Sequence, residues 1–189
     1  MLSKKHICFF LAGLCSIAYF NSIHGEFIID DPYAVVNNPQ IENLWASALD
    51  PALFCNALSY RIGKLNVAPH HIVSIIVHCL NTILVFFFLQ RFYGQEPSLA
   101  GAALFAVHPV HVEAVSWISG RTYLLLAFFV LMTYLLYEKA TRLAAQEKKA
   151  YAVFYLLSLL IFSYFINSQF SYYSFLPFFL VFSDCVSRR

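Results

Sequence analysis

The sequence is poor in charged residues, which make up only 12% of its 189 residues. A soluble domain usually carries about a quarter, because charged side chains cover much of its surface. Hydrophobic residues amount to 60%. This composition excludes an ordinary water-soluble globule. It predicts an all-α integral membrane protein, in which lipid solvates the apolar surface and each helix satisfies its own backbone.

Further absences exclude other classes of protein. The five cysteines contain no C-x-x-C pair and their number is odd, so we expect no cysteine-based zinc or redox site. No basic tract is longer than two residues, so we expect no nucleic-acid partner. The chain also has no internal repeat, no tetratricopeptide pattern and no low-complexity tract.

Six apolar blocks are present, at 7–23, 72–89, 99–110, 123–137, 151–166 and 172–182. A transmembrane helix needs roughly 20 residues, so the shorter blocks span only with flanking polar residues. We expect about six transmembrane helices in a single membrane domain, 1–189. The first block follows Lys4 and Lys5, as a signal peptide would, but no A-x-A cleavage pattern follows it. We therefore expect an uncleaved anchor.

The Lys and Arg residues predict the orientation of these helices. With both termini in the cytoplasm, nine cations lie on the cytoplasmic side and three on the other. This agrees with the positive-inside rule, and the inverted orientation does not. The segments 24–71 and 108–121 are then extracytoplasmic loops, in a bacterial periplasm or in the lumen of the endoplasmic reticulum. The three external cations are Arg61, Lys64 and Arg121.

The first loop carries two adjacent carboxylates, Asp30 and Asp31, a few residues after the first apolar block. Neighbouring like charges raise one of the two pKa values, which suits a general base. Alternatively, either residue could cap a helix that begins at Pro32. Spacing alone leaves both readings open.

The rest of the first loop suggests a surface helix. The pattern over 41–58 is amphipathic and is typical of a helix that lies on a membrane surface. Asn37, Asn38 and Pro39 predict a turn before it. Arg61 and Lys64 could hold an anionic headgroup or phosphate, or could simply be solvated.

The second loop gathers four polar side chains, His108, His111, Glu113 and Arg121. A phosphate could bind to Arg121, with the histidines as donors or proton carriers. Packing at the membrane interface is an open alternative. The spacing matches no zinc pattern, and a helix would not place Glu113 beside both histidines, so we expect no metal.

Two polar residues fall inside the second apolar block. His78 and Asn81 lie near its middle, where polar groups are costly and usually face other helices. We expect them to bond a neighbouring helix. A transporter subunit would need ionisable groups at this depth along several helices, and only His78 is so placed.

Three regions of the chain resemble one known family in the order in which they occur. They are the first-loop stretches 27–31 and 36–41, the segment 70–81, and the most specific one, AALFAVHPVHVEAVSWISGR at 102–121. The chain is similar there to the N-terminal membrane part of the transmembrane and tetratricopeptide-repeat O-mannosyltransferases. That family belongs to the GT-C class of glycosyltransferases.

The resemblance implies protein glycosylation, by transfer of a sugar such as mannose from a polyprenyl- or dolichyl-phosphate donor. The acceptor would be a protein or glycan outside the cytoplasm. The family's first-loop acid implies that Asp30, with Asp31 beside it, is catalytic. We place Arg121, His108 and His111 at the donor phosphate, with Glu113, Arg61 and Lys64 in support. Membrane lipid and the lipid-linked sugar are the expected partners.

Two departures from the family favour a second hypothesis, a non-catalytic membrane scaffold or subunit derived from this fold. Where the family has Arg-Pro-Leu late in the first loop, this chain has Asp50-Pro51-Ala52. Where it has Lys-Glu before a later proline, this chain has Phe170-Ser171. The family also continues into further spans and tetratricopeptide repeats, so we expect a fragment, a split gene product or a reduced relative. A small transporter subunit is the third hypothesis.

Overall fold

The computed structural model describes residues 3–168, with the side chains of residues 3–164. No strand occurs among these residues, which confirms the all-α prediction for the described part of the chain. They divide into two compact units between Phe128 and Phe129. The long helix α6 (Arg121–Ala145) contributes to both units.

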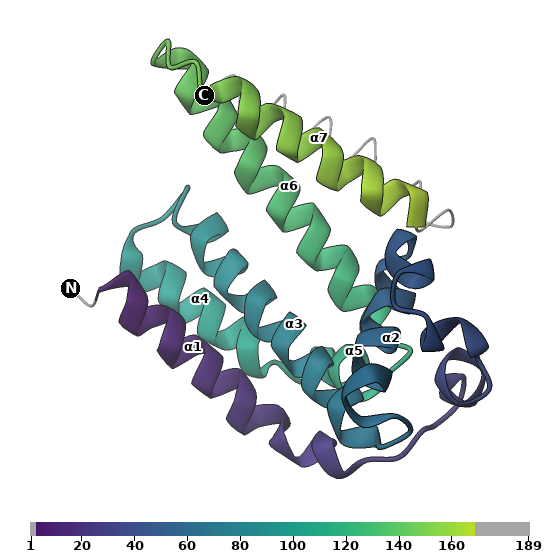
Figure 1. Ribbon diagram of the computed structural model, residues 1–189. Coiled ribbons are helices and arrows are strands. Elements are labelled where there is room, and N and C mark those ends of the chain that lie inside the picture. The colour runs from purple at the N-terminus through teal and green to yellow at the C-terminus, as the bar shows by residue number, and fades with distance from the viewer. Residues whose placement is uncertain (1–2, 169–189) are drawn as a thin grey trace. The chain divides into compact units, whose positions relative to one another are not determined.

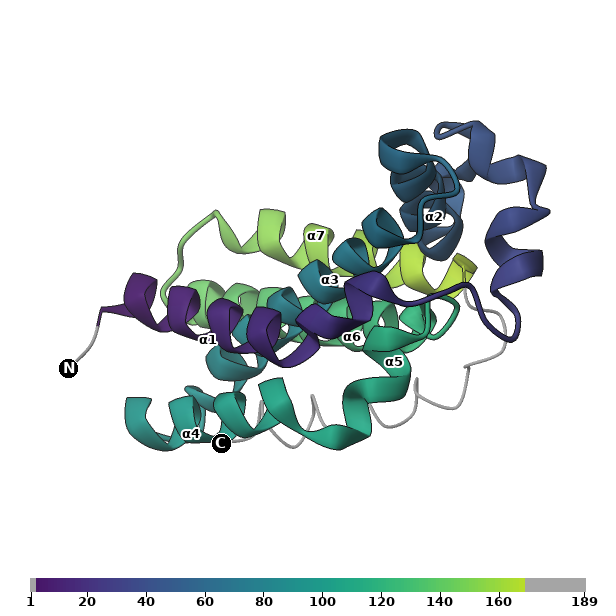
Figure 2. The ribbon, with the colours of Figure 1, turned by 90° about the horizontal axis from the view of Figure 1, so that it is seen from below.

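Three helices of the first unit pack side by side, as Figures 1 and 2 show: α1 (Lys4–Tyr19), α3 (Val67–Leu89) and α4 (Gln95–Val107). Ile7 and Leu11 of α1, Phe86 of α3 and Ala102 of α4 form their shared core. Gly101 of α4 allows a close approach, since a Cβ there would lie 2.7 Å from the Cδ1 of Leu89. Large apolar side chains therefore fill the spaces that a small residue leaves.

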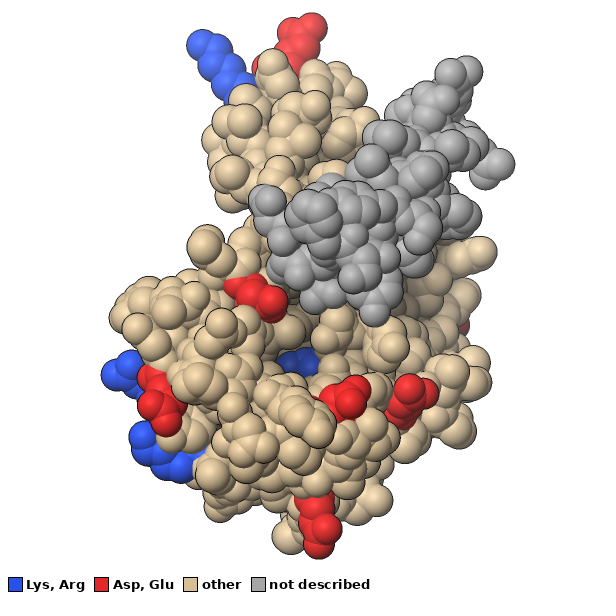
Figure 3. Space-filling model, turned by 90° about the vertical axis from the view of Figure 1, so that its right-hand side faces the viewer, with Lys and Arg blue, Asp and Glu red and all other residues tan. Residues whose placement is uncertain are grey.

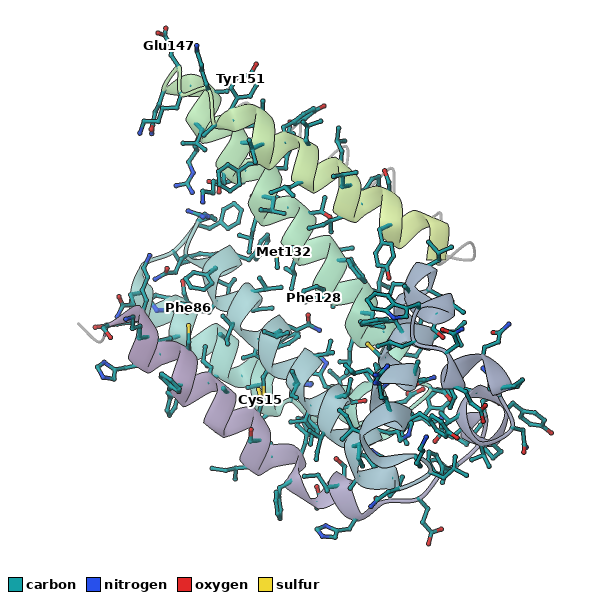
Figure 4. All side chains as sticks on the ribbon, viewed as in Figure 1. Cys15, Phe86, Phe128, Met132, Glu147 and Tyr151 are labelled. Carbon is teal, nitrogen blue, oxygen red and sulfur yellow. The ribbon has the colours of Figure 1, made fainter. Side chains whose placement is uncertain are left out.

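Polar side chains of α3 also bond its neighbours. The Nδ2 of Asn81 donates to the carbonyl of Leu124 at 2.8 Å, and His78 Nε2 lies 3.0 Å from the carbonyl of Ala106. Both side chains are fully buried, which confirms that they face other helices. Thr82 Oγ1 lies 3.2 Å from the sulfur of Cys15 on α1. Figure 4 shows Cys15 and Phe86 on these two adjacent helices.

The third apolar block is broken, as its proline predicts. Helix α4 ends at Val107, and the 3₁₀ turn η5 (Pro109–His111) and short helix α5 (Val112–Ser116) follow at a bend of 47°. The Nδ1 of His108 accepts from the amide of Val110 and so caps the N-terminus of η5. Pro109 lacks the amide hydrogen that would continue α4, so the chain turns here.

The first loop folds into short turns and one helix. After the 3₁₀ turn η1 (Phe20–His24) come a π-helical turn η2 (Pro32–Val36), then η3 (Pro39–Glu42), η4 (Ala46–Leu49) and the helix α2 (Pro51–Gly63). The turn predicted at 37–39 is confirmed, because Asn38 Oδ1 accepts from Gln40 N. The helix predicted over 41–58 is wrong in its start. Asp50 accepts from the amides of Ala52 and Leu53 and begins α2 at Pro51.

A second apolar core joins the two loops. Val35 and Ile41 of the first loop, Ala57 of α2 and Ile118 of the second loop are buried together. Ile118 comes shortly before α6, so this core brings residues far apart in the sequence to one place. The loops thus form one folded region.

The second unit contains the rest of α6 and the helix α7 (Tyr151–Ser168). Phe129 and Tyr164 contact each other edge to face, and Lys139 lies 3.9 Å above the ring centroid of Phe154. These two helices therefore pair through aromatic side chains along their length.

Three described helical stretches are long and apolar enough to span a membrane: Lys4–His24, Val67–Leu89 and Arg121–Ala145. The bent pair α4 and η5–α5 could make a fourth span. Residues Tyr151–Tyr164 form a shorter apolar helix. These helices indicate a membrane protein. Six spans therefore remain a prediction, and the block expected at 172–182 lies outside the described residues.

Candidate functional site

The carboxylate of Asp31 ties the first loop to the second. Its Oδ1 accepts hydrogen bonds from both the amide (2.9 Å) and the hydroxyl of Ser119, and its Oδ2 accepts from the amide of Ile28 at 3.0 Å. The side chain is fully buried. Asp31 precedes η2 but makes no side-chain cap bond to it, so of the two readings left open by the sequence, capping does not hold for Asp31. Asp31 instead connects two distant segments.

Asp30 stands beside Asp31 in the opposite environment. It is exposed, and no described residue makes a hydrogen bond or ion pair with its carboxylate. Its backbone carbonyl accepts from the amides of Tyr33 and Ala34, so the main chain at this position is held in place. An acceptor hydroxyl could therefore reach a carboxylate on an ordered backbone, the geometry that a general base needs. The catalytic roles of Asp30 and Asp31 stay predictions.

Arg121 is the largest fully buried side chain among the described residues. Its guanidinium donates to Asn56 Oδ1 and Ser74 Oγ at 3.0 Å each, and to the carbonyl of His70. These partners lie on α2 and α3. No described carboxylate makes an ion pair with Arg121, although the charge of Asp31 acts on it. Arg121 therefore carries a buried positive charge and joins three helices.

The two histidines of the second loop have different surroundings. His108 is exposed, whereas His111 is half-buried with its ring 4.2 Å from that of Phe105 and 5.3 Å from that of His78. Glu113 is exposed on α5. The ring centroids of His108 and His111 are 6.2 Å apart, so these two side chains lie together, whereas Arg121 is bonded to a different set of residues.

Arg61 and Lys64 lie exposed at the end of α2. Lys64 has φ 54°, and its ammonium lies 4.8 Å above the ring centroid of Tyr60. Neither side chain makes an ion pair among the described residues, so both could meet an anionic headgroup.

A separate feature of one face of the molecule is visible in Figure 3. One basic side chain lies at the bottom of a hollow, apart from the basic side chains at the edge of this face, and acidic side chains lie nearby.

Within the described part of the chain, no three His, Cys, Asp or Glu residues come together in a way that could hold a metal ion. Two other kinds of residue at this site do not follow from the sequence pattern. Ser119 donates to Asp31, and Asn56 accepts from Arg121. The only indication of these roles in the sequence is that both residues lie in the two predicted loops. His71 is fully buried and neither ring nitrogen has a described hydrogen-bond partner.

Comparisons with known proteins identify the family to which this chain belongs. Mouse protein O-mannosyl-transferase TMTC1 is 33% identical over an alignment 156 residues long, which covers 69% of this chain and 16% of the relative. The human TMTC1 protein is 31% identical over 69% of this chain and 18% of the relative. The chain is therefore a relative of the TMTC protein O-mannosyltransferases. A Caenorhabditis elegans protein O-mannosyl-transferase, F38B6.6, is 30% identical over 68% of the chain and 22% of its own length.

The TMTC relationship confirms the resemblance found in the sequence. The chain spans about a fifth or less of the length of these relatives. No protein-family model and no solved structure matches the chain. The GT-C fold therefore stays a prediction, and the activity of this TMTC relative has to be argued from its site.

Proposed function

We propose that this chain is a GT-C-like glycosyltransferase region that transfers a sugar from a polyprenyl-phosphate donor to an extracytoplasmic hydroxyl. Its relatives are named protein O-mannosyltransferases, and its apolar helices suit a lipid-linked donor. The observation that carries the proposal is the contrast between Asp30 and Asp31. The carboxylate of Asp31 is buried and accepts hydrogen bonds through both oxygens. The carboxylate of Asp30 is exposed, and the backbone carbonyl of Asp30 is hydrogen-bonded.

In the proposed reaction, Asp30 takes the proton of the acceptor hydroxyl. The acceptor oxygen forms a bond to the anomeric carbon of the sugar while the bond from that carbon to the phosphate oxygen breaks. The electron pair of that bond leaves with the polyprenyl phosphate. The buried charge of Arg121 would favour this anion, and His108 and His111 would donate to it. Glu113, Arg61 and Lys64 would support lipid or headgroup binding, and no step requires a metal.

The test is sugar transfer by the full chain, reconstituted in lipid, from a panel of polyprenyl-phosphate sugars. Asp30→Asn should lower transfer by about 10²-fold or more, the usual contribution of a general base. Glu26→Gln is the matched control, because Glu26 is another exposed acid of the same loop. Equal transfer by Asp30→Asn and the native chain would remove Asp30 from the mechanism.

A non-catalytic scaffold is the second candidate. It is favoured by the full engagement of Arg121 with Asn56, Ser74 and His70, which a purely structural residue would also show. A folded chain that transfers no sugar from any donor would support it. Asp30→Asn would then leave every measured property of the chain unchanged.

The proposed orientation places both termini in the cytoplasm of a bacterial cell, or on the cytoplasmic face of the endoplasmic reticulum. Single cysteines introduced at the exposed Asn43 and Gln146 test it in a cysteine-free chain. In bacterial cells, a reagent that cannot cross the inner membrane should label position 43 from outside and position 146 only after permeabilisation. In sealed microsomes of the endoplasmic reticulum, whose outer face is cytoplasmic, it should label position 146 directly and position 43 only after permeabilisation. The reverse labelling would invert the orientation.

A further inference from the structure

The turn that carries Asp30 contains a strained residue. Ile29 has φ 54°, in the left-handed region. A β-branched residue rarely adopts this conformation, because its side chain crowds the backbone there. Such strain persists only where the surroundings hold the chain in place. Ile29 is also 70% exposed, so apolar packing of its side chain does not hold it.

Hydrogen bonds to Asp31 are what hold this turn. The amide of Asp31 donates to the carbonyl of Ile28 at 2.9 Å, and the amide of Ile28 donates back to Asp31 Oδ2 at 3.0 Å. Among the described residues, the other oxygen of Asp31 accepts only from Ser119, through its amide and its hydroxyl. A buried carboxylate needs such donors, since water cannot solvate it. Two of the three described donors to the Asp31 carboxylate thus belong to Ser119.

Ser119 is itself fixed at the start of α6. Two residues later, Arg121 bonds to Asn56 of α2 and to Ser74 of α3. Ile118, on the other side, is buried in the core that joins the loops. The donor groups of Ser119 therefore lie between two neighbours that are anchored in the folded region of the two loops, and they can hold the turn at 28–31 against the rest of that region.

We propose that Ser119 is a positioning residue, which holds the strained turn at 28–31 through Asp31 and so presents Asp30 to the acceptor. This inference rests on the proposed function in one respect only, the role of Asp30 as the base. The hydrogen bonds by which Ser119 stabilises the turn can be tested whether or not the chain transfers a sugar.

Hydrogen exchange of the segment 27–34 tests that hold on the full chain in lipid. Ser119→Ala removes one charge-assisted donor, and exchange of the segment should become on the order of ten-fold faster. Ser119→Thr keeps the hydroxyl and should restore slow exchange. Ser116→Ala is the matched control, a serine of the same loop with no described side-chain bond, and should change nothing.

A double variant tests the strain. Ile29→Gly removes the penalty of the left-handed conformation. Combined with Ser119→Ala, it should return the exchange of the segment toward the native rate. Unchanged exchange in Ser119→Ala, or no recovery in the double variant, would overturn the proposal that Ser119 holds a strained turn.

Transfer kinetics test the link to Asp30. Ser119→Ala should lower kcat by about ten-fold or more with little change in the KM for the donor, and Ser119→Thr should recover it. Faster exchange with an unchanged kcat would overturn the positioning role. Failure of Asp30→Asn to affect transfer would remove the proposed function, while the exchange result would still decide the hold on the turn.

Discussion

The Nη1 of Arg121 donates to the Oδ1 of Asn56 across 3.0 Å, and both side chains are buried. Removing the guanidinium would leave the Oδ1 of Asn56 without its described donor, whereas the hydroxyl of Ser74 would still bond to the carbonyl of His70. An unsatisfied buried group costs about 1–3 kcal/mol and the cavity left by the side chain adds to this, so Arg121→Ala should lower the unfolding free energy by roughly 3 kcal/mol or more. Denaturant titration in detergent micelles measures this.

Arg61→Ala is the control for that experiment. Arg61 is exposed on α2 and should change the free energy by no more than about 0.5 kcal/mol. If Arg121→Ala unfolds as the native chain does, the buried guanidinium is not a structural link. Its charge would then be available to the donor phosphate alone.

Asn81 makes a hydrogen bond between two candidate spans, from α3 to the carbonyl of Leu124. Interhelical bonds in membranes are worth about 0.6 kcal/mol on average and about 1.7 at most. Asn81→Leu should therefore lower the unfolding free energy by about that amount, measured by SDS titration. Leu80→Ala, at a half-exposed neighbour, should show a smaller effect of packing alone. A loss above the upper value would assign Asn81 further partners.

Asp50 begins α2 by capping two amides, at 2.8 Å to Ala52 and 3.1 Å to Leu53. Loss of an N-cap costs typically about 1 kcal/mol, so Asp50→Ala should raise hydrogen exchange in the first turn of α2 roughly five-fold. Asp50→Asn retains a capping oxygen and should behave as the native chain. Equal losses in both variants would show that the charge of Asp50, and not its capping bonds, stabilises α2.

Cys55 has a thiol that burial keeps protonated. Burial raises the pKa of Cys55 above its usual value, and the nearby Arg121 lowers the pKa in part. In a chain with Cys55 as the only cysteine, maleimide labelling should rise with pH at a higher midpoint than in a free cysteine peptide. A lower midpoint would mean that Arg121 outweighs burial.

The same shift in the pKa of Cys55 has a consequence for stability. Because the folded pKa is raised, the thiol's contribution to stability is fully present below the unfolded pKa of about 8.5. It is lost as the pH rises through the folded pKa. Cys55→Ala should therefore lessen the alkaline loss of stability, measured by thermal unfolding between pH 8 and 11.

Parts of the fold follow from local patterns. The candidate spans at α1, α3 and α6 coincide with predicted apolar blocks extended by flanking residues, and Pro109 marks the break after α4. The start of α2 did not follow, because the amphipathic pattern began earlier than the capping aspartate, Asp50. Periodicity shows which face is apolar, whereas a cap decides where a helix begins.

The sequence by itself determined the class of this protein, its family and the two loops that carry polar groups. Composition and order along the chain are sufficient for those conclusions, because they depend on solvation and on local motifs. Only the tertiary structure decided the separate environments of Asp30 and Asp31, and the engagement of Arg121 with α2 and α3. Adjacent residues look equivalent in a sequence. Their burial and partners depend on segments that approach only when the chain folds, as Ser119 approaches Asp31.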